Sequence, residues 1–125
     1  MKGLTLDAGA LIAFERNDRK VVALLARALE LGLAFSVPAG VVGQVWRDGR
    51  RQARLARLLA AKEVEIAALD DQRAREAGQL CGAKRRKDVV DASVILCARA
   101  RDHRIVTSDP EDMLAFDAAA DPIAV

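Results

Sequence analysis

Short apolar segments alternate with longer segments of helical periodicity along this 125-residue chain. This alternation is typical of a parallel sheet that is covered by helices on both faces. We therefore expect an α/β fold, a three-layer α/β/α sandwich with a mostly parallel central sheet, in one domain over residues 1–125. The expected strands are residues 4–6, 33–37, 64–66, 104–106 and, at an edge, 122–125. The expected helices are residues 8–15, 19–31, 39–59 with a break near Gly49, 70–81, 88–101 and 110–116.

The core is expected to consist of aliphatic side chains, because the chain has three Phe, one Trp and no Tyr. With so few aromatic rings, no surface for base stacking is expected, so phosphate contacts would dominate any binding of nucleic acid. Cys81 and Cys97 lack the spacing of metal ligands, and we expect them to be buried apolar residues in a reducing cytoplasm. No apolar segment approaches the roughly 18 residues needed to span a bilayer. We therefore expect a cytoplasmic protein without membrane contact.

Positive charge is unevenly distributed, although the net charge is only +2. The arginines of residues 47–57 are opposed only by Asp48, and residues 84–87 form an uninterrupted basic run. Such clusters fit a polyanionic partner, and they fit equally a solvated surface without a partner.

Carboxylates lie at or near the ends of two predicted strands and at the start of one predicted helix. Asp7 directly follows the first strand, and Asp109 lies three residues after the fourth. Asp88 and Asp91 are three residues apart at a helix start, so they share one helix face. Ligands of open parallel sheets bind at the carboxyl ends of the strands, so we expect these carboxylates to come together there.

Several carboxylates in one cleft raise one another's pKa unless a positive charge lies between them. A hard divalent cation supplies this charge, and Mg²⁺ or Mn²⁺ keeps positions open for water and a phosphate. Such an ion activates water as a nucleophile and neutralises the charge that develops on a phosphodiester. The pattern therefore predicts metal-dependent hydrolysis, with Asp7, Asp91 and Asp109 as catalytic metal ligands and Asp88 as a further candidate.

Each carboxylate also has a purely structural interpretation near a helix start. Asp7 and Asp109 precede predicted helices, and Pro110 suits the first helical position after Asp109. Asp88 is well placed as an N-cap, with Asp91 three residues on in an arrangement like a capping box. Capping and metal binding are compatible. For Asp91 the interpretation as a metal ligand is favoured, because its helix is otherwise apolar and burying an unpaired carboxylate is costly.

Other chemistry is not supported by the sequence. His103, the only histidine, lies on the turn before the fourth strand and is expected to face solvent, so a histidine-activated nucleophile is not predicted. The chain contains neither a G-x-x-x-x-G-K-[ST] loop nor a G-x-G-x-x-G motif. A phospho-accepting receiver domain would need an acidic pair after the first strand and a Lys after the fourth. Asp7 instead stands alone, and no Lys follows Val106.

Four motifs, in register along essentially the whole chain, resemble the PIN-domain family and most closely its VapC toxin branch. They are Leu6-Asp7-Ala8-Gly9-Ala10-Leu11-Ile12, Val37-Pro38-Ala39 before a helix with Trp46-Arg47, Asp88-Val89-Val90-Asp91-Ala92, and Val106-Thr107-Ser108-Asp109-Pro110. The resemblance implies a PIN-like sandwich, metal-dependent endoribonuclease activity and an acidic metal site. It places the acidic positions of the family at Asp7, Asp91 and Asp109, with Asp88 beside them.

One position departs from the family pattern. The Glu that the family carries on the helix after the second strand is replaced here by Gln44. An amide holds water or a metal only weakly, and the loss of one negative charge would lower metal affinity or favour one ion over two. The residues expected to line the site are Gln44, Thr107, Ser108 and Asp112, the last of which also fits a partner of the helix dipole.

The resemblance also implies binding partners. A VapB-like antitoxin would cover the acidic groove with its tail, and the chain would form a homodimer, within a heterotetramer or a larger complex with the antitoxin. The substrate would be a structured RNA guided by Arg47, Arg50, Arg51, Arg54, Lys84, Arg85, Arg86 and Lys87. The alternative suggested by Gln44 is a catalytically weak PIN domain that acts only by binding antitoxin or RNA.

Overall fold

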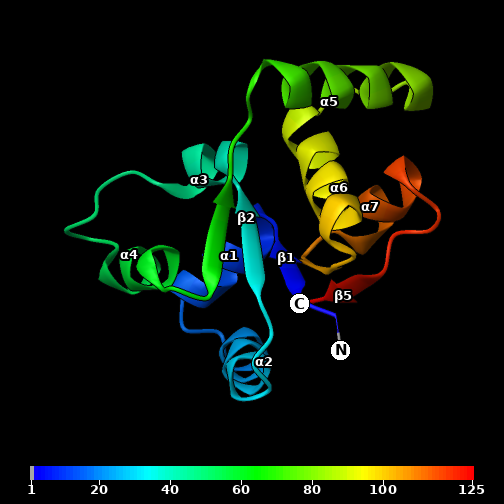
Figure 1. Ribbon diagram of the computed structural model, residues 1–125. Helices are drawn as coiled ribbons and strands as arrows, with labels where there is room; N and C mark the ends of the chain where they lie inside the picture. Colours follow the sequence, from blue (N-terminus) through cyan, green and yellow to red (C-terminus); the bar gives the residue numbers. More distant parts are fainter. Residues whose placement is uncertain (1) are drawn as a thin grey trace.

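The central sheet of the computed structural model, which describes residues 2–125, is parallel throughout (Figure 1). Its strands run in the order β3-β2-β1-β4-β5, so the first strand of the chain lies in the middle. The α/β class and the parallel sheet predicted from the sequence are thereby confirmed. The strands are β1 (Leu4–Leu6), β2 (Phe35–Pro38), β3 (Val64–Ala67), β4 (Arg104–Thr107) and β5 (Pro122–Ala124).

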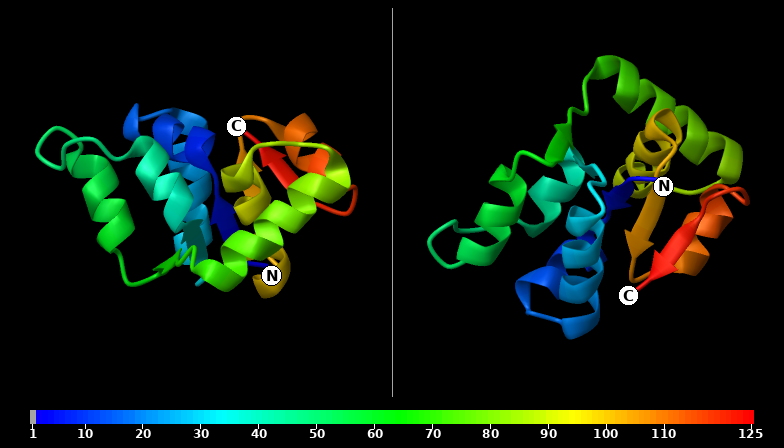
Figure 2. Two further views of the ribbon diagram at one scale, coloured as in Figure 1. Left: turned by 90° about the horizontal axis from the view of Figure 1, so that it is seen from above. Right: turned by 60° about the horizontal axis from the view of Figure 1, so that its bottom comes forward.

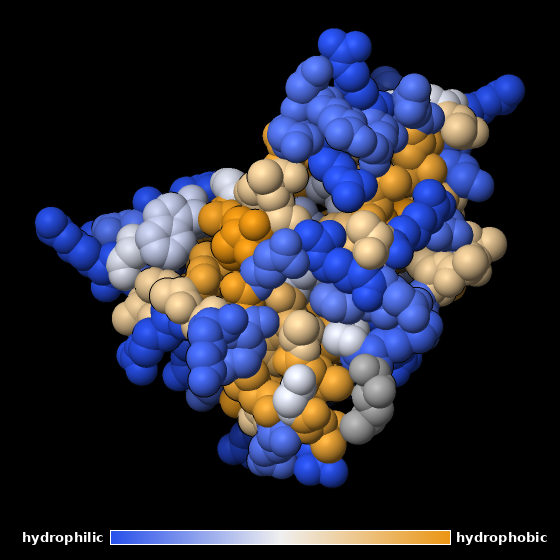
Figure 3. All heavy atoms as spheres, viewed as in Figure 1, coloured by the Kyte–Doolittle hydropathy of each residue, from blue (hydrophilic) through white to orange (hydrophobic). Residues whose placement is uncertain are grey.

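Helices cover both faces of the sheet in two groups (Figures 1 and 2). Helix α1 packs with α2, α3 and α4, whereas α6 packs with α5 and α7 and against β1, β2 and β4. The outer side of α5 and the tip of the segment between α3 and α4 are hydrophilic (Figure 3). The helices are α1 (Ala8–Glu15), α2 (Arg19–Glu30), α3 (Ala39–Val45), α4 (Ala53–Ala60), α5 (Asp71–Lys84), α6 (Val89–Arg101) and α7 (Pro110–Phe116).

The core between these layers is mainly aliphatic, as expected from the composition. Leu6, Leu11 and Val37 are completely buried, and Phe35 and Phe116 are the largest fully buried side chains. Both cysteines are buried and free, as the sequence predicts. Within residues 2–125, every helix is too short or too polar to cross a bilayer.

The break that the sequence predicts near Gly49 within residues 39–59 is confirmed, and it spans residues 46–52 between α3 and α4. The cause is the buried side chain of Gln52, which satisfies the backbone of this segment in place of helical hydrogen bonds. Its Oε1 accepts from the Arg47 and Asp48 N–H groups at 2.8 and 2.9 Å. Its Nε2 donates to the Val45 carbonyl at 2.8 Å and to Glu15 Oε1 at 2.9 Å.

His103 is half-buried and hydrogen-bonded, which corrects the expectation that it faces solvent. Its Nδ1 lies 3.2 Å from the hydroxyl oxygens of both Thr5 and Ser36, and Cys97 Sγ donates to Ser36 Oγ at 3.4 Å. Thr5 and Ser36 are register partners on β1 and β2, so their hydroxyls lie side by side. Burial lowers the pKa of His103. Because Ser36 is fully buried, the pair does not form an open nucleophilic site.

Gly3 provides the space that His103 occupies. A Cβ at Gly3 would lie 2.5 Å from His103 Nε2 and 2.6 Å from the Ala34 carbonyl oxygen. We expect Gly3→Ala to lower the free energy of unfolding by about 1–3 kcal/mol, because one of these neighbours must move. Gly78→Ala is the matched control, since Gly78 lies inside α5 with open space around it. It should raise the free energy of unfolding by about 0.5–1 kcal/mol. Equal effects in urea unfolding would contradict this account.

Candidate functional site

Asp7 occupies the junction between β1 and α1 and is only 5% exposed. Its Oδ1 accepts from the Ala10 N–H at 2.9 Å, so the helix-cap interpretation is correct. Burial raises the pKa of Asp7, and the negative charge of Asp109 adds to this shift. Hydrogen bonds from Thr107 and Ala10 oppose it. The cap therefore offsets only part of the unfavourable burial of this carboxylate.

Asp88 and Asp91 lie at the start of α6 and have different roles. Asp88 caps the helix, and Asp91 is a half-buried carboxylate with a raised pKa. Asp88 Oδ1 accepts from the Asp91 N–H at 2.9 Å, which confirms Asp88 as the N-cap. The half-buried Asp91 has its pKa raised to about 6, first by burial and then by the charges of Asp88, Asp7, Asp112 and Asp109. These carboxylates come from three separate parts of the chain, and all act on one side chain. We call Asp7, Asp88, Asp91, Asp109 and Asp112 the acidic cluster.

Asp109 is exposed where β4 leads into α7. It occupies the N-cap position and Pro110 is the first helical residue, as expected, but the Asp109 side chain makes no capping hydrogen bond. Its own N–H instead donates to Thr107 Oγ1 at 2.8 Å. The negative charge of Asp112 is the main cause that raises the pKa of Asp109. The α7 carboxylates therefore repel each other as well as Asp91.

Two glycines that the sequence analysis did not single out as site residues bring these helix starts together. A Cβ at Gly9 in α1 would overlap the side chain of Ser108, approaching its Cβ to 2.7 Å. A Cβ at Gly40 in α3 would lie 3.2 Å from a methyl carbon of Val90, the residue before Asp91. The absence of a side chain at both positions allows α1 to approach the β4–α7 loop and α3 to approach α6.

The acidic cluster fits a hard divalent cation by the chemistry of its donors. Its carboxylates raise one another's pKa, and a cation among them would remove this repulsion. Among residues 2–125, no three carboxylate, histidine or cysteine side chains are close enough to form a preassembled metal site. Mg²⁺ does not need such a preassembled set, because it keeps several waters and binds through one or two carboxylates together with substrate phosphates.

A family model of the PIN domain matches residues 4–120. The chain belongs to the PIN domain family. No curated protein sequence matches it. The fold is similar to that of VapBC2 from Rickettsia felis bound to a promoter DNA fragment, with a TM-score of 0.71, 13% identity and 97% of each chain covered. A toxin–antitoxin complex from Klebsiella pneumoniae gives a TM-score of 0.70 at 16% identity, covering 98% of this chain and 97% of that one. FitAcB from Neisseria gonorrhoeae gives 0.66 at 18% identity, with 96% of each chain covered.

Gln44, which the sequence analysis assigns to the position of the family's Glu, is on α3, a helix that contributes no member of the acidic cluster. It is exposed on α3, one helical turn after Gly40. Residues four apart lie on the same side of a helix, so Gln44 shares the side of α3 that approaches Val90. Its neutral amide reduces the negative charge of this PIN-domain site relative to a Glu.

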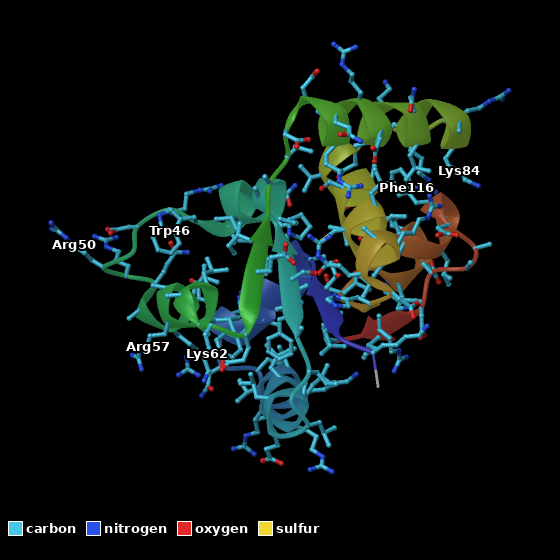
Figure 4. All side chains as sticks on the ribbon, in the orientation of Figure 1. Trp46, Arg50, Arg57, Lys62, Lys84 and Phe116 are labelled. Atoms are coloured by element: carbon cyan, nitrogen blue, oxygen red, sulfur yellow. The ribbon has the colours of Figure 1, made fainter. Side chains whose placement is uncertain are left out.

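The arginines of residues 47–57 do not join the acidic cluster. Arg50 and Arg57 extend into solvent on the α4 side of the molecule, away from α5–α7 (Figure 4). Arg47 Nη1 donates to the carbonyls of Gly43 and Trp46, and Arg54 Nη1 donates to Asn17. These side chains form a separate basic surface beyond α3.

The second basic set, Lys84–Lys87, adjoins the acidic cluster directly. Helix α5 extends to Lys84, beyond the predicted end at 81, so only residues 85–88 connect α5 to α6. Arg85 ends the helix in the left-handed conformation, with φ of 55°. Arg86 Nη1 lies 3.6 Å from Asp112 Oδ1. A hollow of about 470 Å³ is lined by Lys84, Arg85, Arg86, Lys87, Asp88, Asp91, Asp112 and Phe116.

The raised pKa of Asp91 predicts how pH affects the metal-free protein. Asp91 titrates at about 6 when folded, against 3.8 for an ordinary Asp, so its ionisation destabilises the fold above about pH 6. This destabilisation shrinks as pH falls from about 6 toward 4, because the folded protein takes up the proton first. Asp91→Asn should therefore melt several degrees higher than the parent near pH 7 in chelator, and this difference should narrow as pH falls.

Asp18→Asn is the control for this comparison, because Asp18 is an exposed N-cap of α2 outside the cluster. Its melting temperature should follow that of the parent at every pH. An Asp91→Asn difference that is absent near pH 7, or that widens in acid, would show that Asp91 is not held among other negative charges.

Proposed function

We propose that this PIN-domain chain is the toxin component of a type II toxin–antitoxin pair and hydrolyses RNA phosphodiester bonds with Mg²⁺ or Mn²⁺. The observation that carries the proposal is that Asp91 is half-buried at the start of α6, where the adjacent Asp88 and the distant Asp7, Asp109 and Asp112 add negative charge to a carboxylate already disfavoured by burial. The fold is shared with solved VapBC and FitAB structures, which supports the toxin assignment. Nuclease chemistry is the use of such a cluster that best explains its unpaired negative charge.

In this proposal Asp7, Asp91 and Asp109 would hold the ion, directly or through its bound waters. Asp88 fixes the start of α6 through the Asp91 N–H, and the Thr107 hydroxyl orients both Asp7 and the Asp109 backbone. A bound Mg²⁺ or Mn²⁺ supplies an activated water and neutralises charge on the phosphodiester. The starts of α1 and α6 add the positive ends of their helix dipoles beside that charge.

The two basic surfaces would contact RNA in different ways. The hollow beside Lys84–Lys87 is continuous with the acidic cluster, so these cations can hold phosphates next to the bond that is cleaved. The surface marked by Arg50 lies away from Lys84, on the α4 side of the molecule (Figure 4), so Arg47, Arg50, Arg51 and Arg54 would contact a more distant part of the same RNA. The separation between these two basic surfaces favours, as the substrate class, a folded RNA that reaches both of them.

The partner in this proposal is a VapB-like antitoxin whose tail covers the acidic cluster. Two toxin copies would pair as a homodimer, in a heterotetramer or larger complex, in the cytoplasm. The solved structures with this fold include a VapBC2 complex on promoter DNA and a toxin–antitoxin complex from another bacterium, which supports pairing with an antitoxin.

A second candidate function is a PIN domain that binds RNA or antitoxin but cleaves RNA poorly. The observation that favours it is Gln44, which removes one charge from the site. Incubating RNA with the protein and Mn²⁺, against a chelator control, separates the two functions. Cleavage that requires the metal supports the nuclease, whereas binding of intact RNA in both conditions supports the second function.

Asp7→Asn and Asp91→Asn should each abolish RNA cleavage in Mn²⁺ while the far-ultraviolet circular dichroism stays unchanged. An Asn at position 7 can still accept the Ala10 N–H, so the cap survives while the charge is lost. Asp18→Asn is the matched control, because Asp18 also caps a helix through the N–H groups of Lys20 and Val21. Full activity in both Asp7→Asn and Asp91→Asn would place the active site elsewhere.

RNA affinity should fall steeply with salt, because phosphate contacts release counterions. Replacing Lys84, Arg85 and Lys87 together by Gln should reduce the slope of log affinity against log salt by about 2, at roughly 0.7 per phosphate contact on a single strand. It should also slow cleavage. The same change at Arg50, Arg51 and Arg57 should reduce the slope but leave cleavage of a short RNA unaffected. Affinity that barely changes between low and moderate salt would refute both RNA surfaces.

A further inference from the structure

Arg86 crosses from the α5–α6 connection to α7 and is held there by two contacts. Its Nη1 lies 3.6 Å from Asp112 Oδ1, and its guanidinium carbon lies 5.6 Å from the centre of the Phe116 ring. Phe116 is 1% exposed and therefore rigidly packed. A cation over an aromatic face is attracted by the ring as well as by the carboxylate. The position of Arg86 is thus defined by α7 and not by its own flexible connection alone.

The carboxylate that Arg86 contacts, Asp112, affects the pKa of other members of the acidic cluster. Asp112 is the main cause of the raised pKa of Asp109, and its charge also raises the pKa of Asp91. Among residues 2–125, Arg86 is the only cation whose ion pair ends on a member of the acidic cluster. Among the described residues, the acidic cluster therefore has one paired cation, the partly exposed Arg86.

We propose that Arg86 is a built-in counter-cation of the acidic cluster, and that a divalent metal held by the neighbouring carboxylates competes with its guanidinium for the negative charge of Asp112. Metal binding frees Arg86 from Asp112, and the guanidinium then faces the hollow beside Lys84–Lys87 while it stays on Phe116. In that position it is a positioning residue for a substrate phosphate, because the hollow is lined by Arg86 and by the three other cations of this run.

This inference rests on the proposed function only in requiring that the acidic cluster bind a divalent cation. It differs from a general effect of positive charge, which Arg85 and Lys87 also exert as neighbours of the hollow. The distinguishing feature is the specific coupling between Arg86 and Asp112, and a double-mutant cycle measures such a coupling directly.

The experiment is calorimetric titration of Mn²⁺ into the metal-free full chain and four variants. Arg86→Met keeps much of the apolar stem but removes the charge, and Arg85→Met is the matched control. Asp112→Asn and the combination of Asp112→Asn with Arg86→Met complete the cycle. We expect Arg86→Met to bind Mn²⁺ about two- to fivefold more tightly than the parent, the size expected when a partly exposed ion pair is removed. Arg85→Met should change the affinity less.

In the Asp112→Asn background, Arg86→Met should bring no further gain in Mn²⁺ affinity. An equal gain from Arg86→Met and Arg85→Met, or a gain that persists in the Asp112→Asn background, would overturn the inference. RNA cleavage by the same samples separates it from the proposed function. If the parent cleaves RNA but Arg86→Met binds Mn²⁺ no more tightly, only this inference fails. If the cycle behaves as expected but the parent cleaves no RNA, only the nuclease proposal fails, and absence of Mn²⁺ binding overturns both.

Discussion

Repulsion among carboxylates at one edge of a parallel sheet governs the structure around the site. Asp7, Asp88 and Asp109 stand at the starts of α1, α6 and α7, because each of these helices begins where the chain passes this edge. Helix starts tolerate negative charge, since their free N–H groups and dipoles favour it. The backbone therefore stabilises each carboxylate separately while bringing all of them together. Burial, and then the repulsion that remains among these carboxylates, keep the pKa of Asp91 raised to about 6 despite these helix starts.

Close packing between backbone segments sets how near the carboxylates come to one another. Gly9 lets α1 approach Ser108, and Gly40 lets α3 approach Val90, so that neither helix is held away by a side chain. Interiors of proteins are packed too densely for an added methyl group to be absorbed without movement. The approach of Asp7 to the β4–α7 loop therefore depends on Gly9, and the approach of α3 to the start of α6 depends on Gly40, although neither residue carries a charge.

Local features of this chain could be predicted from sequence, whereas features that depend on distant pairing could not. The positions of Asp7, Asp88 and Asp91 follow from the ends of a strand and the start of a helix, which hydrophobic periodicity and capping rules identify. The sequence predicts a break near Gly49, but its extent over residues 46–52 depends on Gln52 bonding to Glu15 and Val45, contacts that exist only in the folded chain. The burial of His103 depends likewise on the register of β1 and β2. The contact between Arg86 and Asp112 requires α5, α6 and α7 to be already assembled.

The distribution of charge also links the metal to the substrate. An RNA drawn toward Lys84–Lys87 meets Asp88, Asp91 and Asp112 in the same hollow, and these carboxylates repel its phosphates. A divalent cation in the cluster reverses that local charge, so on the proposed function it would raise RNA affinity as well as enable hydrolysis. Because coupling between two ligands is reciprocal, RNA bound in the hollow must raise metal affinity by the same factor. On the proposed function, an amide at Gln44 in place of a carboxylate would weaken metal binding in the absence of RNA, and this coupling is the physical route by which a bound substrate would restore it.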